Sequence, residues 1–243
     1  KFLYLWIGLL ISIAGSQMQL SALHWHIREL TGEPDPLALG GIGLARILPI
    51  ILFSVIGGPV ADTLNRRKIL FITQSLLTLV ALALAALTFT GKITIWWIYL
   101  LTAIQASATA FDLPARQAMI PNLVRREDLP TAFSMSSIAN NTGSVLGPVL
   151  SGLVIATLGQ AYTYLFNAIS FLAVIVALIL IGTVPQETHQ STGIHLDAMK
   201  DGVQFISKQP MILSTMIMDF FATFFASANT MMPIVARDIL KVG

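Results

Sequence analysis

The sequence has no cysteine, which excludes disulfide-bonded scaffolds and thiolate metal sites. It is also poor in charge, since only 11% of its 243 residues are charged whereas soluble domains carry roughly 25%. The net charge of +2 gives no indication of nucleic-acid binding. Because 55% of the residues are hydrophobic, the composition predicts that the chain is solvated by lipid.

The sequence also lacks motifs that are typical of catalytic, metal-binding or nucleotide-binding sites. The sequence has no His-Glu-x-x-His motif and no clustered acids within its apolar stretches, so a membrane-embedded enzyme is not indicated. Glycines gather at Gly40, Gly41 and Gly43, but no Gly-Lys-Ser/Thr follows, which argues against a nucleotide-binding loop. We therefore expect no metal, no cofactor and no direct use of ATP.

Seven apolar stretches are long enough to cross a bilayer, which takes about 20 residues in a helix. Backbone groups in hydrocarbon must be hydrogen-bonded internally, and these runs do not alternate between polar and apolar residues, so helices are expected. The predicted spans are residues 2–27, 37–61, 69–89, 94–113, 130–158, 162–181 and 211–235. This predicts an all-α, multi-pass membrane protein.

Two predicted connections are long, at 114–129 and 182–210. In the second, apolar residues recur at helical spacing among charged ones over 196–208, which predicts an amphipathic helix on the membrane surface or an ordinary surface helix. We therefore expect a six-helix bundle over 1–182, a cytoplasmic linker over 183–210 and the start of a second bundle over 211–243. The chain begins at Lys1 rather than methionine and is expected to be part of a longer protein.

Basic residues predict the orientation, because cytoplasmic loops are enriched in Lys and Arg. With the N-terminus in the cytoplasm of a plasma (inner) membrane protein, the outer side holds Arg28, Lys92, Arg237 and Lys241. The inner side then holds the larger set: Lys1, Arg66, Arg67, Lys68, Arg116, Arg125, Arg126, Lys200 and Lys208.

A short internal repeat agrees with this orientation. The pattern Gly-x-Val-x-x-Thr-Leu occurs at 58–64 and again at 152–158. The two copies end the second and fifth predicted spans, on opposite sides of the membrane, as an inverted three-plus-three repeat requires. A chance match is the alternative.

The loop between the second and third spans carries the most specific motif. A carboxylate at the membrane boundary is costly when unpaired, and here Asp62 is followed by a tight turn and the basic cluster 66–68. The segment resembles the signature Gly-x-Leu-Ala-Asp-Arg-x-Gly-Arg-Lys-x-x-Leu of the major facilitator superfamily. Matching residues are Gly58, Ala61, Asp62, Arg66 and Leu70, with Arg67 for the usual Lys. Thr63 replaces the first Arg, and Asn65 replaces the turn glycine, where a left-handed backbone is expected.

The resemblance implies a twelve-helix fold, of which this chain holds the first six helices and the seventh. It also implies a gate latch between Asp62 and Arg116, with Asp112 one turn away as a competitor for Arg116. A purely structural ion pair is the alternative.

The fifth span adds a second motif. Gly143, Gly147 and Ser151 recur every four residues, which allows close helix packing, and Pro148 removes a backbone donor and bends the helix. With Gly152, the segment resembles the Gly-x-x-x-Gly-Pro-x-x-Gly-Gly motif of exporters. The segments 46–49, 114–117 and 125–129 resemble the branch that contains siderophore exporters and macrolide efflux proteins.

Charged residues deep in a membrane are functional candidates. Arg46 lies roughly 14 Å and Asp219 roughly 12 Å into their predicted spans. We expect Asp219 to couple protons and Arg46 to attract an anionic substrate; in each case an internal ion pair is the alternative. Because the resemblance implies that helices 1, 4 and 7 line the cavity, the expected lining is Gln17, Gln19, Gln105 and Asp219, with apolar walls at Met18, Trp25 and Phe111.

These observations favour a monomeric secondary exporter that moves a small molecule against protons by alternating access. His24 and His26 are expected at the membrane interface rather than in a proton relay. A structural or signalling membrane protein, or a lipid-directed member of the same fold, is the alternative.

Overall fold

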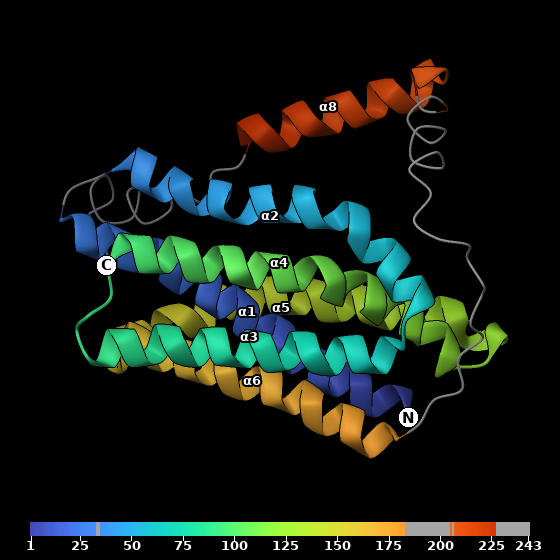
Figure 1. Cartoon of the computed structure of the whole chain (residues 1–243), viewed down its shortest axis with the longest axis horizontal. Coiled ribbons are helices and arrows are strands. Elements are labelled where there is room, and N and C mark those ends of the chain that lie inside the picture. The colour runs from blue at the N-terminus through green and yellow to red at the C-terminus, as the bar shows by residue number, and fades with distance from the viewer. Residues whose placement is uncertain (33–34, 183–204, 206, 227–243) are drawn as a thin grey trace. The chain divides into compact units, whose positions relative to one another are not determined.

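The computed structural model describes residues 1–32, 35–182, 205 and 207–226, and every regular element in these ranges is helical (Figure 1). The chain divides into two units, 1–189 and 190–243, which are described separately. The first unit holds α1 (Phe2–Thr31), α2 (Pro36–Thr63), α3 (Arg66–Phe89), α4 (Ile95–Met119), η1 (Ile120–Asn122), η2 (Arg126–Asp128), α5 (Leu129–Thr157) and α6 (Gln160–Ile181). The second holds α8 (Pro210–Ala226).

The six long helices of the first unit pack in one series. The principal pairs are α2 with α4, α4 with α3, α3 with α6, α6 with α1, and α1 with α5 (Figure 1). Exchanging α1–α3 with α4–α6 maps this set of pairs onto itself, which is the symmetry that a three-plus-three repeat predicts. The series begins with α2 and ends with α5.

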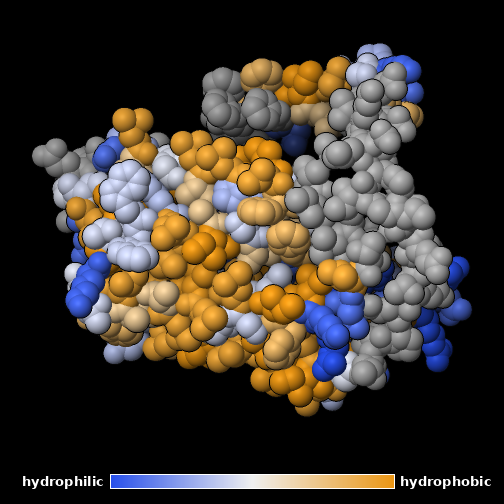
Figure 2. Space-filling model, in the orientation of Figure 1, coloured by the Kyte–Doolittle hydropathy of each residue, from blue (hydrophilic) through white to orange (hydrophobic). Residues whose placement is uncertain are grey.

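The core lies among the four inner helices of this series. One cluster of buried residues joins α1, α3, α4 and α6 through Leu5, Leu70, Met119 and Leu178. A second cluster, centred on Phe171, joins α3, α4 and α6. In Figure 2, hydrophobic side chains cover the middle of the visible helices and hydrophilic ones gather toward their ends. Such an outer surface suits lipid, and the protein is a multi-pass integral membrane protein.

Five helices in the described ranges are long and apolar enough to cross a membrane: Phe2–Thr31, Pro36–Ser54, Arg66–Phe89, Arg126–Thr157 and Gln160–Ile181. The fourth predicted span, α4, is not among them, although its 25 residues pack between α2 and α3. It carries Asp112 and Arg116, which lower its hydropathy.

Two predictions about the connections between helices are wrong. The prediction of a connection from 114 is incorrect, since α4 continues through Pro114 to Met119. Proline leaves the carbonyl of residue i−4 without its helical donor, here Ala110, and Gly57 of α2 approaches that carbonyl so closely that a Cβ would collide with it. In the loop, Asn65 is not left-handed: at φ −64° it caps α3, and its side chain accepts from the Lys68 N–H at 3.2 Å.

The second unit is described only in part. The seventh predicted span, 211–235, is helical over 211–226 as part of α8, and its remainder lies outside the described residues. The predicted amphipathic helix at 196–208 lies almost entirely outside them too.

Candidate functional site

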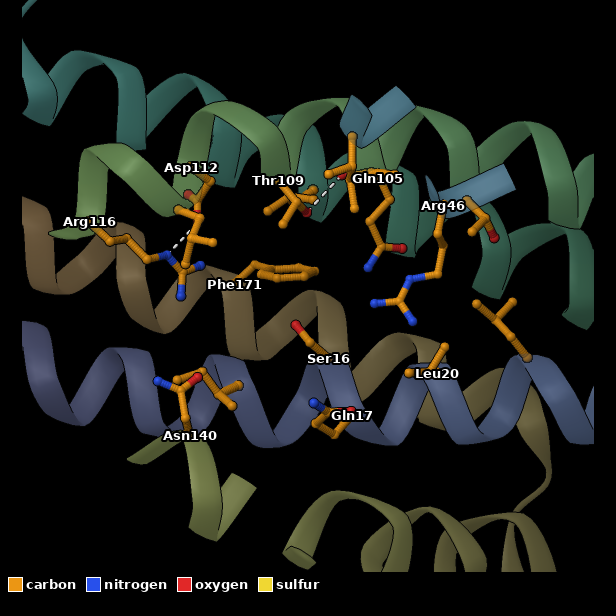
Figure 3. Close-up of a pocket in the computed structure, with 17 residues that line it drawn as sticks. Ser16, Gln17, Leu20, Arg46, Gln105, Thr109, Asp112, Arg116, Asn140 and Phe171 are labelled. Atoms are coloured by element: carbon orange, nitrogen blue, oxygen red, sulfur yellow. Dashed lines mark hydrogen bonds and ion pairs between the residues drawn. The ribbon is translucent and has the colours of Figure 1, made fainter. Parts of the chain in front are cut away.

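A cavity of about 210 Å³ opens within the first unit, between the inner faces of the helices (Figure 3). Polar or charged side chains reach it from α1, α2, α4 and α5, and apolar ones also from α3 and α6. Its lining consists of Ile13, Ser16, Gln17, Leu20, Leu23, Arg46, Ile50, Leu77, Thr102, Gln105, Ala106, Thr109, Asp112, Leu113, Arg116, Asn140 and Phe171. Five of the residues that the sequence singled out therefore share one cavity: Gln17, Arg46, Gln105, Asp112 and Arg116.

Asp112 is held on both of its oxygens. The carboxylate is buried, with 3% of the residue exposed. Its Oδ1 accepts hydrogen bonds from Thr73 Oγ1 at 2.8 Å and Gln74 Nε2 at 2.7 Å, and its Oδ2 pairs with Arg116 Nε one turn along α4. The sequence reasoning missed Thr73 and Gln74, whose only signal was a run of three polar residues, 73–75, within an apolar span.

Arg46 stands apart from this network. Its side chain extends from α2 into the cavity, toward the space beside Gln105 and Leu20 (Figure 3). Within the described part of the chain, no hydrogen bond or ion pair holds the guanidinium. Because the charges of Asp112 and Arg116 compensate each other, the described lining carries one uncompensated positive charge, that of Arg46.

A chain of buried amides runs behind the cavity. Ser170 Oγ donates to Asn167 Oδ1 at 2.9 Å, Asn167 Nδ2 donates to Gln19 Oε1 at 2.7 Å, and Gln19 Nε2 donates to Gln105 Oε1 at 2.5 Å. Gln19 was expected in the lining, but it is fully buried and reaches the cavity only through Gln105. Gly15 leaves room for this network, since a Cβ there would lie 2.7 Å from Asn167 Oδ1.

The predicted apolar walls do not line this cavity. Met18 lines a second, mostly apolar cavity of about 330 Å³ between α1, α5 and α6. Phe111 packs instead against Phe53, with ring centroids 5.9 Å apart, and Trp25 is half-buried outside the lining. His26 is buried, and its Nδ1 lies 2.9 Å from Tyr164 Oη, so its side chain packs within the bundle.

The basic loop binds the ends of two other helices. Arg66 donates to the Ala118 carbonyl at 2.8 Å and Arg67 to the Leu178 carbonyl at 3.0 Å, near the C-termini of α4 and α6, where helix dipoles favour cations. Gly58 and Asp62 lie in the stretch of α2 whose side chains are not described, so the predicted Asp62–Arg116 contact lies outside the described residues. The described partner of Arg116 is its predicted competitor, Asp112.

The glycine face of α5 packs closely on α1, as predicted. A Cβ at Gly143 would lie 2.5 Å from Ile13 Cγ2, and one at Gly147 would lie 2.9 Å from the Ala14 carbonyl oxygen. Ser151 continues this buried face, whereas Gly152 has open space around it. The helix runs unbroken through Pro148.

Asp219 lies in α8, where its side chain is exposed within the second unit. The two units are not placed relative to one another, so the predicted contribution of Asp219 to the cavity lies beyond what is described.

Comparison with known proteins identifies the chain's relatives. The transmembrane secretion effector family matches residues 1–243. The staphyloferrin A transporter of Staphylococcus aureus is 29% identical over 89% of this chain and 54% of its own. The multidrug efflux pump Tap of Mycolicibacterium fortuitum is 26% identical over 86% and 53%. The enterobactin exporter of Shigella boydii is 23% identical over 76% and 44%.

The chain thus spans about half the length of the curated relatives it matches. It belongs to the transmembrane secretion effector family, whose members are major facilitator superfamily transporters rather than enzymes, and it is related to siderophore and drug exporters.

Proposed function

We propose that the chain forms the N-terminal half of a proton-coupled exporter that carries a small molecule across the plasma (inner) membrane by alternating access. The observation that carries the proposal is the cavity, because it brings Arg46, Asp112, Arg116 and glutamines together inside an apolar bundle. Charged groups are expensive at membrane depth and are retained there chiefly for transport or coupling. The exporters among the relatives support this direction of transport.

In this proposal the inner gate is an exchange of partners. Arg116 is bound to Asp112, while Asp62 lies in the last turn of α2, on the proposed cytoplasmic side. We propose that Arg116 moves between these carboxylates as the cavity changes the side to which it opens. Arg66 and Arg67 keep the start of α3 bound to the ends of α4 and α6, which would make these three helices move as one body.

Asp219 is the proposed proton-coupling residue, because α8 is otherwise apolar around this carboxylate. The test uses the full-length protein in vesicles with an imposed proton gradient and a panel of siderophores and drugs. We expect gradient-dependent substrate accumulation that a protonophore abolishes. Asp219→Asn should abolish accumulation driven by the gradient while leaving substrate exchange at equal pH intact.

The matched control is Gln117→Leu, which changes an exposed polar residue of α4 outside the cavity. It should transport as the parent protein does. If no compound moves with the gradient, the proposal fails and a structural or signalling role is favoured. A lipid-directed role would instead appear as movement of labelled lipid; the mostly apolar cavity between α1, α5 and α6 favours this as the second candidate.

A further inference from the structure

We propose that the cavity binds the carboxylate of an amphiphilic small molecule between the Arg46 guanidinium and the side-chain nitrogen of Gln105. Gln19 and Asn167 act as positioning residues, which turn that nitrogen toward the cavity. The inference rests on the proposed transport function and names the substrate class of the same site.

The charges of the lining carry the first step. Asp112 Oδ1 accepts from Thr73 and Gln74 and its Oδ2 pairs with Arg116, so the negative charge of this acid is already compensated in this arrangement. Arg46 presents its guanidinium to the cavity without an ion-pair partner among the described residues. A bound anion would offset the cost of this charge at membrane depth. A planar carboxylate matches the guanidinium fork with two parallel hydrogen bonds.

The amide chain carries the second step. The side-chain oxygen of Asn167 accepts from Ser170, and that of Gln19 accepts from Asn167. The last hydrogen bond of this chain is donated by Gln19 and occupies Gln105 Oε1. Gln105 therefore presents its nitrogen to the cavity. In Figure 3 this nitrogen and the Arg46 guanidinium point into the same space. Two groups that only donate select a ligand that only accepts.

The remaining lining defines the body of the ligand. Leu20, Ile50, Leu77 and Phe171 provide apolar walls beside the two donors. The volume of about 210 Å³ is below the ~300 Å³ of the smallest drug-sized sites. The described half of the protein thus has room for one carboxylate-bearing end of a molecule with an apolar, ring-sized group next to it.

Three probes with one skeleton test this: 3-phenylpropionate, 3-phenylpropanamide and 3-phenylpropylamine. Equilibrium binding of the radiolabelled acid to the purified full-length protein is measured in competition with the other two. We expect the acid to bind on the order of tenfold more tightly than the amide and the amine not to compete. Arg46→Gln should abolish this preference. Gln105→Glu should weaken acid binding by at least about tenfold, because it sets a carboxylate against a carboxylate.

Gln19→Leu and Asn167→Leu test the positioning role. Once the chain is broken, Gln105 is able to turn its oxygen toward the cavity and accept from the amide probe. The ratio of acid to amide affinity should therefore fall several-fold, a change that general loosening of the site would not produce. Asn167→Asp is a reversing variant: both carboxylate oxygens accept, so Gln19 donates its nitrogen to residue 167 and presents its oxygen to Gln105. Gln105 then donates to Gln19 and turns its own oxygen toward the cavity, and the ratio of acid to amide affinity should fall in this variant as well.

The controls are Gln117→Glu and Arg126→Gln, which make the same charge changes at exposed positions outside the cavity and should bind as the parent protein does. Where Arg46→Gln does not yield a monodisperse protein, Arg46→Lys serves instead and should weaken binding while keeping the preference for the acid. No binding of the acid, equal binding of the amine, or an unchanged preference in Arg46→Gln would overturn the inference. Proton-linked transport of another compound would then leave the proposed function standing. Acid binding without any proton-linked transport would remove the proposed function instead.

Discussion

The pair α3 and α6 differs sharply in burial from the pair α2 and α5. In the most apolar stretches of α3 and α6, 56% and 50% of the residues are buried, whereas the corresponding shares for α2 and α5 are 17% and 22%. The difference follows from the packing series, because α3 and α6 lie in its middle while α2 and α5 end it. Each end helix thus has one principal neighbour, α4 for α2 and α1 for α5.

This comparison distinguishes the helices that are buried within the bundle, α3 and α6, from those that are mostly exposed, α2 and α5. The end helices expose large apolar side chains such as Leu48 and Ile51 of α2 and Val149 of α5. Under the proposed function the chain is one half of a longer exporter, and we predict that the other half covers α2 and α5. On this interpretation, α3 and α6 expose their outer faces to lipid.

The largest effect on stability is expected for a substitution in the middle of the packing series of helices. Asp112→Ala removes the acceptor shared by Thr73, Gln74 and Arg116 and leaves a mostly buried cation alone, which costs about 3–5 kcal/mol. Thermal unfolding in detergent, followed by size-exclusion chromatography, should show a clear fall in Tm. Combining Asp112→Ala with Arg116→Leu should recover much of the loss; a double variant no more stable than Asp112→Ala would contradict this account.

A smaller effect is expected at the end of the series, where α5 meets α1. At Gly147 a side chain would collide with Gln17 Cβ and lie 3.0 Å from the Met18 nitrogen. Gly147→Leu must therefore push the helices apart, at a cost of about 1–3 kcal/mol. The matched control is Gly152→Leu on the same helix, where no neighbouring atom lies within 4 Å. Equal Tm values for the two variants would show that the close packing of α5 on α1 contributes little.

The sequence was sufficient to predict the helices of the first unit but not all of their ends. Apolar length locates a membrane helix because a span needs about 20 such residues. Caps and prolines are less informative, since Asn65 begins α3 by capping it and Pro114 lies inside α4 rather than after it. In the second case the Ala110 carbonyl, which Pro114 leaves without its helical donor, lies against the Gly57 backbone, and this contact joins residues distant in the sequence.

For the site, the type of a residue helped to predict whether it is functional, but the direction in which its side chain points could not be predicted from the sequence. Arg46 was predicted because charged groups are rare in apolar helices, Gln105 because the resemblance implies that helix 4 lines the cavity, and Asp112 as a neighbour of the gate arginine. All three line the cavity. Gln19, Asn167 and Thr73 show the limit of this reasoning. These helices are apolar on nearly every face, so periodicity does not indicate which way a polar side chain points. The partner of Arg116 was ambiguous for the same reason, although Asp112 had the advantage of lying one turn away.

The smallest effect on stability, and the sharpest test of the comparison, comes from single cysteines on the two pairs of helices. The chain has no cysteine of its own, so Val149→Cys on α5 and Leu79→Cys on α3 each give one attachment site for a nitroxide label in this half. Both side chains are exposed, at 64% and 63%, and both changes should alter stability by less than about 0.5 kcal/mol.

In the full-length protein in a bilayer, with any cysteines of the remainder replaced, the label at 79 should meet dissolved oxygen freely because it faces lipid. The label at 149 should be shielded by the second half. In residues 1–243 alone the two accessibilities should converge. Equal accessibility in the full-length protein would mean that α5 faces lipid there, and the low burial of α2 and α5 would then no longer indicate where the two halves meet.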